Sequence, residues 1–202
     1  MARSLKSPGS RGKPRPRRFS AEGDFVARLE RPERKRHMPA GRIVSRLALR
    51  TGDVVVDLGA GIGYFGIPMA KEGANVVGLD IEPKMLQILT ARARDERTGR
   101  VHAVRADILA IPLKDGSADR VFGACIYHEV EAPEKLIAEA SRVLKPHGRL
   151  TIIDFQKRRT SFGPPVRERK TPGHVVRAAS SSFDLRSKHE TGVYYQLDFE
   201  KR

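Results

Sequence analysis

Cysteine is almost absent from this 202-residue chain, which contains only Cys125. A single thiol can form neither an internal disulfide framework nor a cysteine-based metal cluster. The sequence therefore fits a reducing compartment and predicts no metal site. Asparagine occurs once and glutamine three times. This scarcity is compatible with heat adaptation, and the accompanying arginine richness equally with genome composition.

Long apolar runs are also missing. No segment approaches the roughly 18 consecutive apolar residues that a membrane-spanning helix needs. The basic residues at the N-terminus are not followed by an apolar stretch, so they do not resemble a secretory signal. We therefore expect a cytoplasmic protein without a membrane span. Its oligomeric state is not indicated by the sequence.

Acidic residues are few relative to basic ones, 24 against 39, and the net charge is +15. The excess is confined to residues 1–20, 31–50 and 157–177, which carry +7, +6 and +6, while the remainder carries −4. Such segments can attract an anionic substrate or a phosphate backbone. RNA or another polyanion is thus one candidate partner, and a solvated surface without a partner is the alternative.

The composition divides the chain into a tail and one domain. Residues 1–22 are rich in Pro, Gly, Ser and Arg and have too few apolar residues to form a core, so they are predicted to be a disordered basic tail. Residues 23–202 are predicted to form the domain. Within it, apolar residues recur at helical spacing around Pro32 and Pro39, which predicts two short helices in a cap over residues 23–50.

Strand and helix patterns alternate after residue 50, which predicts an α/β fold with a Rossmann-like, doubly wound, mostly parallel sheet. The predicted strands are 54–58, 75–79, 101–105, 120–126 and 149–154, and the predicted helices are 64–71, 83–94 and 133–144. The Lys-Pro-His-Gly sequence at 145–148 is expected to stop the last of these helices. Segments 183–185 and 193–199 follow without a helix between them, so they are predicted to pair as an antiparallel hairpin at the sheet edge.

A glycine-rich loop follows the first predicted strand, in the sequence VVVDLGAGIGYFG from residue 54. Its spacing fits both the phosphate-binding turn of a dinucleotide site and the loop of an S-adenosylmethionine (SAM) site. Asp57 lies two residues before the first glycine, where a carboxylate is unfavourable for a pyrophosphate and favourable for the ammonium of SAM. Asp80 does not discriminate, because an acid at this spacing can bind ribose hydroxyls in either system. A tight turn without a ligand is the remaining alternative.

Four motifs together resemble the class I SAM-dependent methyltransferases, in the subgroup that includes the ubiquinone and menaquinone methyltransferases. They are DLGAGIG at 57–63, VVGLDIE at 76–82, RADI at 105–108 and EASRVLKPHGRLTIID at 139–154. The similarity extends to the Gly-Pro-Pro sequence at 163–165 and to the helical segment before the first motif, which covers the site in relatives. It spans the chain from about residue 25 onward.

The resemblance implies a role for each motif residue. Gly59, Gly61 and Gly63 would let the backbone approach the methionine part of SAM, and Asp57 would orient its ammonium directly or through water. At the other end, the binding residues would be Asp80 for the ribose hydroxyls, Ile81 for the adenine face, and Asp107 for the adenine amino group with Ile108 beside it. For Asp107, a helix N-cap is the alternative reading.

The candidate catalytic residues lie in CIYHEVE, residues 125–131, at the end of the fourth strand of the domain. His128 is the candidate base because its pKa lies near neutrality, and Tyr127 could position the acceptor or contact the sulfonium. The alternative is that His128 only shapes the pocket floor. Glu129 and Glu131 are interpreted as the solvated start of the next helix.

Three functions are compatible with these features. The first is a SAM-dependent methyltransferase whose unidentified acceptor is anionic or associated with nucleic acid; the basic loop after the fifth strand, with Arg167, Arg169 and Lys170, would then rim its site. The second is a non-catalytic RNA-associated domain of the same fold. The third, an NAD-dependent oxidoreductase, lacks a Tyr-x-x-x-Lys or comparable hydride-transfer pair.

Overall fold

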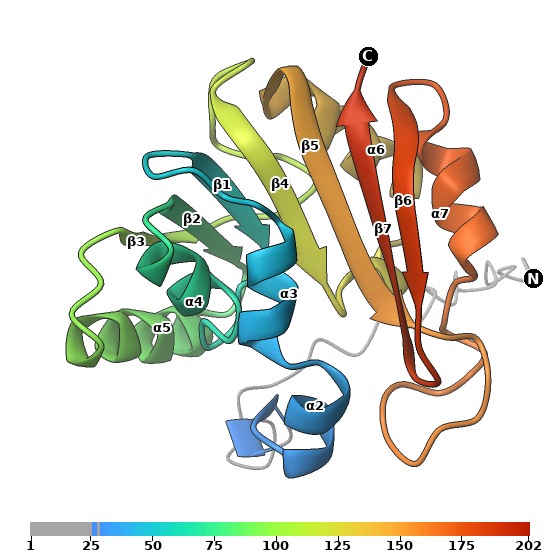
Figure 1. Cartoon of the computed structure of the whole chain (residues 1–202), viewed down its shortest axis with the longest axis horizontal. Helices are drawn as coiled ribbons and strands as arrows, with labels where there is room; N and C mark the ends of the chain where they lie inside the picture. Colours follow the sequence, from blue (N-terminus) through green and yellow to red (C-terminus); the bar gives the residue numbers. More distant parts are fainter. Residues whose placement is uncertain (1–25, 28) are drawn as a thin grey trace, which may run out of the picture.

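Seven strands form one sheet in the order β3-β2-β1-β4-β5-β7-β6. The computed structural model of the chain describes residues 26–27 and 29–202 (Figure 1). The predicted basic tail, residues 1–22, lies outside the described residues. The strands are β1 Val54–Leu58, β2 Asn75–Asp80, β3 Val101–Arg105, β4 Ala118–Ala124, β5 Leu144–Phe155, β6 Phe183–Glu190 and β7 Tyr194–Lys201.

The first five strands are parallel, and the last two run antiparallel to their neighbours. This confirms the predicted doubly wound sheet with an antiparallel edge hairpin. β7 pairs with both β5 and β6. After β5 the chain therefore forms the edge strand β6 first, and β7 then lies between β5 and β6. The carboxyl ends of the parallel strands meet at the lower edge in Figure 1.

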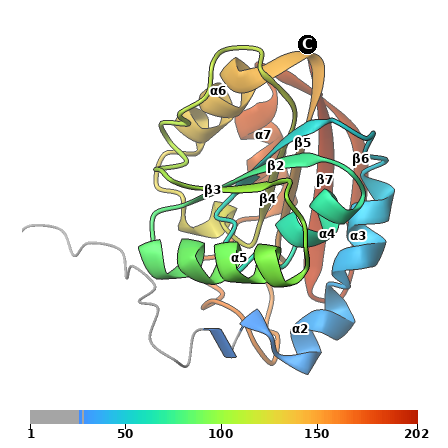
Figure 2. The same ribbon diagram turned by 90° about the vertical axis from the view of Figure 1, so that its left-hand side faces the viewer.

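Helices cover both faces of the sheet. They are α2 Pro32–His37, α3 Ala40–Arg46, α4 Gly66–Lys71, α5 Pro83–Asp95, the 3-10 turn η1 Tyr127–Glu129, α6 Pro133–Val143 and α7 Pro172–Ala179. Figures 1 and 2 show α3, α4 and α5 on one face and α6 and α7 on the other. The two helices expected in the cap correspond to α2 and α3, and α2 lies at the edge where the parallel strands end.

Successive residues of the central strands bury side chains on opposite faces. Val55 and Phe122 pack with α3 and α4, whereas Val56 and Val121 pack with α6 and α7. All four are at most 1% exposed. Burial on both faces explains why these strands appear in the sequence as continuous apolar runs, without the alternation of a one-sided sheet.

Several boundaries differ from the sequence-based expectation. β4 lies two residues earlier than predicted, and β5 begins at residue 144 and not at 149. α4 begins at Gly66 and not at residue 64, because the turn that contains Gly63 extends through residue 65. α6 ends at Val143, before the Lys-Pro-His-Gly sequence, because Leu144 takes an extended conformation and starts β5 by pairing with Ala118. Helix α7 was not predicted at all. Its apolar stripe is short and lies inside a basic segment, although Thr171 caps it by accepting a hydrogen bond from the His174 N–H.

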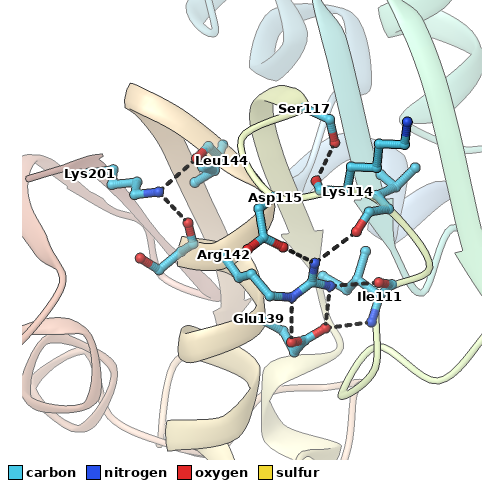
Figure 3. Close-up of polar contacts among 10 residues, drawn as sticks. Ile111, Lys114, Asp115, Ser117, Glu139, Arg142, Leu144 and Lys201 are labelled. Carbon is cyan, nitrogen blue, oxygen red and sulfur yellow. Dashed lines mark hydrogen bonds and ion pairs between the residues drawn. The ribbon is translucent and has the colours of Figure 1, made fainter.

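The Glu and Arg of the EASRVLKPHG motif hold the loop between β3 and β4 against α6 (Figure 3). The Arg142 guanidinium donates to the carbonyls of Ile111 and Leu113 at 2.7 and 2.8 Å, and to the Asp115 carboxylate at 2.7 Å. Glu139 binds Arg142 through both carboxylate oxygens at 2.9 Å and accepts the Ile111 N–H at 2.7 Å. This motif therefore has a structural role away from the carboxyl ends of the strands.

Candidate functional site

The glycine loop connects the end of β1 to α4, and its three candidate glycines all have positive φ angles, of +64° at Gly59, +52° at Gly61 and +83° at Gly63. A β-carbon on Gly63 would lie 2.4 Å from the Leu89 side chain, and one on Gly59 would lie 3.1 Å from Ile126. Packing alone therefore requires these two glycines. At Gly61 a β-carbon would meet nothing closer than the Leu29 side chain at 3.8 Å. Packing therefore does not require a glycine at position 61, and its positive φ angle is what favours one there.

Asp80, at the end of β2, ties the glycine loop to the neighbouring strand. One carboxylate oxygen accepts the Gly61 N–H at 3.0 Å and the other accepts the Glu82 N–H at 2.9 Å. Burial raises the pKa of Asp80, and the two N–H donors oppose this shift. Each oxygen keeps a lone pair for a further donor. Ile81 beside it is 45% exposed, which is unusual for an isoleucine and suits a residue that contacts a flat apolar ligand.

Asp57 lies underneath the loop rather than at its surface. It is only 3% exposed, and a β-carbon on Gly66 would be 3.1 Å from its Oδ2 atom. Burial and the nearby Asp80 raise the pKa of Asp57 from 3.8 to about 7, against the effect of the hydrogen bond from the Gly66 N–H. A water-mediated contact with an ammonium fits this position better than a direct one.

The buried Asp57 gives a testable pH dependence. The folded protein keeps a proton on Asp57 that the unfolded chain has lost between about pH 4 and pH 7. The contribution of Asp57 to the free energy of unfolding therefore falls as the pH rises through this window and is constant above it. Asp57→Asn keeps a hydrogen-bond acceptor and cannot ionise. Urea denaturation across the pH range should show a flatter profile for Asp57→Asn than for the unchanged protein, and parallel profiles would contradict the assignment.

Asp107 and Ile108 follow β3. Asp107 is exposed, and its Oδ1 atom accepts the Leu109 N–H at 2.8 Å. This is a local cap, as in the alternative reading, although a turn and not a helix follows. Ile108 is half-buried against the main core. The Arg105 side chain donates to the Ile81 carbonyl at 3.3 Å and so connects this segment to the end of β2.

A buried His–Asp pair lies where β4 and β5 end. The His128 Nδ1 atom is 2.8 Å from one Asp154 oxygen, and the His128 backbone N–H donates to the other at 2.8 Å. The His128 side chain is 5% exposed and that of Asp154 is 1% exposed. Burial lowers the pKa of His128, but the hydrogen bond and charge of Asp154 outweigh burial and raise it above 6.5. Because a carboxylate can only accept, Nδ1 carries the proton and Nε2 is left as the basic atom.

Glu129 is a functional candidate that the sequence did not reveal. Its carboxylate is 3.5 Å from the His128 Nε2 atom, and its side chain is 35% exposed. Burial raises the pKa of Glu129, while His128 opposes the shift. Glu129 belongs to η1, which is separate from α6, so its interpretation as the start of a solvated helix is corrected. Asp154 was also missed, although its place at the end of the fourth motif was a usable signal.

Tyr127 lies on the other face of the sheet from the aromatic side chains near His128. It is fully buried in the core against α6 and α7. Its hydroxyl is 3.2 Å from the His174 Nδ1 atom. Burial raises its pKa. The structure thus brings His128 together with Asp154 and Glu129, and it does not bring Tyr127 into this group.

Aromatic side chains surround the His–Asp pair on the α3 side. The Phe155 ring is 5.9 Å from the His128 ring, 4.7 Å from Tyr194 and 6.1 Å from Phe162. Phe162 in turn lies 5.9 Å from the His37 ring of α2. These residues come from β5, β7, the loop after β5 and the cap, so the environment of His128 is assembled from segments distant in sequence.

The cap is held over the glycine loop by a few specific contacts. The Tyr64 hydroxyl donates to the Met38 carbonyl at 2.7 Å, and the Arg34 guanidinium lies 4.8 Å above the Tyr64 ring. Glu30 and Arg92 form an ion pair at 2.6 Å that joins the start of the cap to α5. The cap therefore covers the loop, as the resemblance implied.

Arg169 holds the loop after β5 from inside. It is 2% exposed and its guanidinium lies 5.1 Å from the Phe155 ring centre. It donates at 2.8–3.3 Å to four backbone carbonyls and one hydroxyl of this loop, those of Gln156, Arg158, Thr160, Phe162 and Pro164. The expectation that Arg169 would rim the site with Arg167 and Lys170 is therefore corrected, because its charge is used internally.

The described residues were also searched for metal sites and for membrane-spanning helices. Within residues 26–27 and 29–202, no group of three or more His, Cys, Asp or Glu side chains is arranged to hold a metal ion. In the same part of the chain no helix has the length and apolarity needed to cross a membrane.

Comparison with known proteins points to one family. Residues 56–152 match the family described as "Methyltransferase domain". The demethylmenaquinone methyltransferase of Tropheryma whipplei (strain Twist) is 33% identical over 118 residues, which cover 58% of this chain and 48% of the relative. That of Thermus thermophilus is 41% identical over 105 residues, 50% of this chain and 46% of the relative. The chain thus spans about half the length of the curated relatives it matches.

A solved structure extends the similarity to most of the fold. The SAM-dependent methyltransferase from Aquifex aeolicus superposes with a TM-score of 0.82 at 23% identity, covering 91% of this chain and 100% of that one. At this identity the match concerns the fold.

Proposed function

The chain belongs to the class I SAM-dependent methyltransferases, and we propose that it transfers a methyl group from SAM to a small-molecule acceptor held beside His128. The observation that carries this proposal is the buried His128–Asp154 pair, which lies under an aromatic cluster at the same sheet edge as the glycine loop.

The residues at the loop fit SAM. Gly61 offers backbone without a side chain, and the Asp80 oxygens keep lone pairs for the ribose hydroxyls. The exposed Ile81 would pack on the adenine, and Asp107 would accept from its amino group. Asp57 would act on the ammonium through water. When bound, SAM supplies an electrophilic methyl carbon on a sulfonium.

Three groups of this chain act on the acceptor in our proposal. The aromatic rings of Phe155, Phe162 and Tyr194 fix an apolar or aromatic acceptor in place, so that much of the rate enhancement comes from alignment. His128 Nε2 takes the proton that the acceptor loses as its bond to the methyl carbon forms. Asp154 holds the ring and stabilises the resulting imidazolium, and Glu129 adds a second carboxylate next to Nε2.

The acceptor class we favour is a quinol-type ring. The two curated relatives described above are named demethylmenaquinone methyltransferases, and the side chains packed around His128 are aromatic. In such a reaction a bond would form between a ring carbon and the methyl carbon, while the bond from that methyl carbon to the SAM sulfur would break and leave its electron pair on the sulfur. The proton of the ring C–H bond would pass to His128, so no oxidant or reductant is consumed. RNA as the acceptor is less well supported, since Arg169 does not contribute its charge to the rim.

The test is transfer of labelled methyl groups from SAM into a fractionated cell extract. We expect the label in the solvent-extractable fraction, and we expect a purified reduced quinol lacking the methyl group to act as an acceptor. Label that is released by RNase or protease would replace the small-molecule acceptor with a macromolecular one. An absence of label in every fraction would contradict the proposed transferase activity.

The SAM site is tested separately by Asp80→Ala. Loss of hydrogen bonds to a charged group is expected to weaken SAM binding by about 1.5–3 kcal/mol, measured by calorimetry. Glu82→Ala is the matched control, because Glu82 offers Asp80 only its backbone N–H and keeps it after substitution. Equal affinities of Asp80→Ala and the unchanged protein would remove Asp80 from the site, and binding of NAD in place of SAM would contradict the family's cofactor.

A further inference from the structure

A hollow lies between the cap and the β6–β7 hairpin, on the α3 face of the sheet. Its volume is about 270 Å³. The basic side chains around it are those of Arg36, His37, Arg42, Arg46 and His189. None of the described residues that line it is acidic. This concentration of one charge sign separates it from the SAM site, where Asp57 and Asp80 lie.

The arginines of the hollow are available to a ligand. Arg36, Arg42 and Arg46 are exposed, and within the described part of the chain none of them forms an ion pair. Arg42 and Arg46 are four residues apart on α3, so they project from the same side of the helix. Like charges gathered around one hollow repel each other, and a bound anion removes that cost.

The floor of the hollow is apolar. Met38, Ile43, Ile153 and Tyr194 line it and are at most 8% exposed. The Tyr194 hydroxyl is buried and has no hydrogen-bond partner among the described residues. A hollow with a cationic mouth and an apolar floor suits a ligand with both characters. Its volume is near the lower limit for small-molecule sites, which excludes a dinucleotide.

We propose that this hollow is an anion site that takes a phosphate or carboxylate group carried on a short apolar stem. The guanidinium groups bind the anion in the bidentate manner that arginine favours, and the stem lies on the apolar floor. Such a ligand could come from a soluble metabolite or from the headgroup region of an anionic lipid. The proposal does not rest on the methyltransferase function, because its test measures binding alone.

The site would also contact the walls of the methyl-transfer site. His37 and Tyr194 line the hollow, and both rings lie within 6.3 Å of Phe162. A ligand in the hollow would therefore contact two of the residues that define the surroundings of His128.

The probe is hexyl phosphate, titrated into the full chain by calorimetry with hexanol as the neutral comparison. Vesicles of phosphatidylglycerol and of phosphatidylcholine distinguish a lipid source from a soluble one. The test variant is Arg42→Gln with Arg46→Gln. The matched control is Arg94→Gln with Arg177→Gln, two exposed arginines on α5 and α7 that are outside the hollow and remove the same net charge.

We expect hexyl phosphate or phosphatidylglycerol vesicles to bind, and the test variant to bind about tenfold more weakly or worse, since it loses two charge-assisted contacts. The control should stay within about twofold. Should the test variant fail to fold, the single variant Arg36→Gln gives the same comparison against Arg94→Gln. The proposal is overturned if neither probe binds, if hexanol binds as well as hexyl phosphate, or if the control loses as much affinity as the test variant.

Discussion

His128→Ala is expected to lower the turnover number about 100-fold or more while leaving the affinity for SAM nearly unchanged. The reason is that Nε2 of His128 is the basic atom beside the proposed acceptor, with its ring fixed by the 2.8 Å contact to Asp154. Turnover is measured with labelled SAM and affinity by calorimetry. His128→Gln is the matched variant, because glutamine keeps a polar side chain of similar size and cannot act as a base.

The pH dependence of turnover distinguishes a His128 that acts as a base from a His128 that only lines the pocket. A base must be neutral, so turnover of the unchanged protein should rise with pH through the pKa of His128, which Asp154 holds above 6.5. Asp154→Asn removes that carboxylate, and the midpoint should move to lower pH as turnover falls. If His128 only shapes the floor, His128→Gln should restore most of the activity. A flat pH profile in both the unchanged protein and the variants would rule out the base.

Arg169→Met is expected to lower the free energy of unfolding by about 3 kcal/mol or more, because partly buried carbonyls of the loop after β5 lose a donor. The carbonyls of Arg158 and Pro164 lose their side-chain donor, and those of Gln156 and Phe162 keep one other donor each. Arg169 donates five hydrogen bonds within this loop and is 2% exposed. Methionine retains the apolar stem, so the change tests the guanidinium. Urea denaturation measures the total effect, and hydrogen exchange of the loop amides shows where it falls.

Arg167 provides the control two residues away. Its side chain is 83% exposed, and its guanidinium makes a single long contact of 3.6 Å with the Glu168 carboxylate. Arg167→Met should change the stability by no more than about 0.5 kcal/mol. Equal losses in both variants would show that net charge, and not the internal hydrogen bonds of Arg169, stabilises the loop. Turnover should also fall in Arg169→Met, since this loop carries Phe162.

The centre of the sheet was predictable from the sequence because the central strands are buried on both faces. Val54–Leu58 was predicted with its observed bounds, since a continuous apolar run ending in a turn has few alternatives. Val101–Arg105 was also predicted with its observed bounds, although it is an edge strand that is only partly buried. Helix α7 was not predicted, because eight residues with a narrow apolar stripe give little periodicity within a basic segment. α7 is stabilised by the packing of Val175 and Ala179 into the core. These tertiary contacts cannot be predicted from the local sequence pattern.

The candidate site was predictable only in part. The glycine loop and Asp80 are close in sequence to the strands that position them, so their local motifs were sufficient to predict where they lie. The partner of His128 is 26 residues away, and its contact depends on the register of β4 against β5. The orientation of Tyr127 depended on which face of the sheet η1 would present, and spacing did not determine that. Arg169 looked like surface charge because its acceptors are backbone carbonyls, which are invisible in a sequence.

The position of β7 between β5 and β6 affects how the protein is made. Asp154 and Phe155 pair with Tyr195 and Tyr194, and β7 follows every other element of the site in chain order. During synthesis on the ribosome, β5 therefore has an unpaired, largely apolar edge until β7 emerges. The aromatic surroundings of the His128–Asp154 pair, which include Tyr194, can be completed only at that moment. A nascent chain stalled before β7 would be inactive and prone to join another chain through this edge.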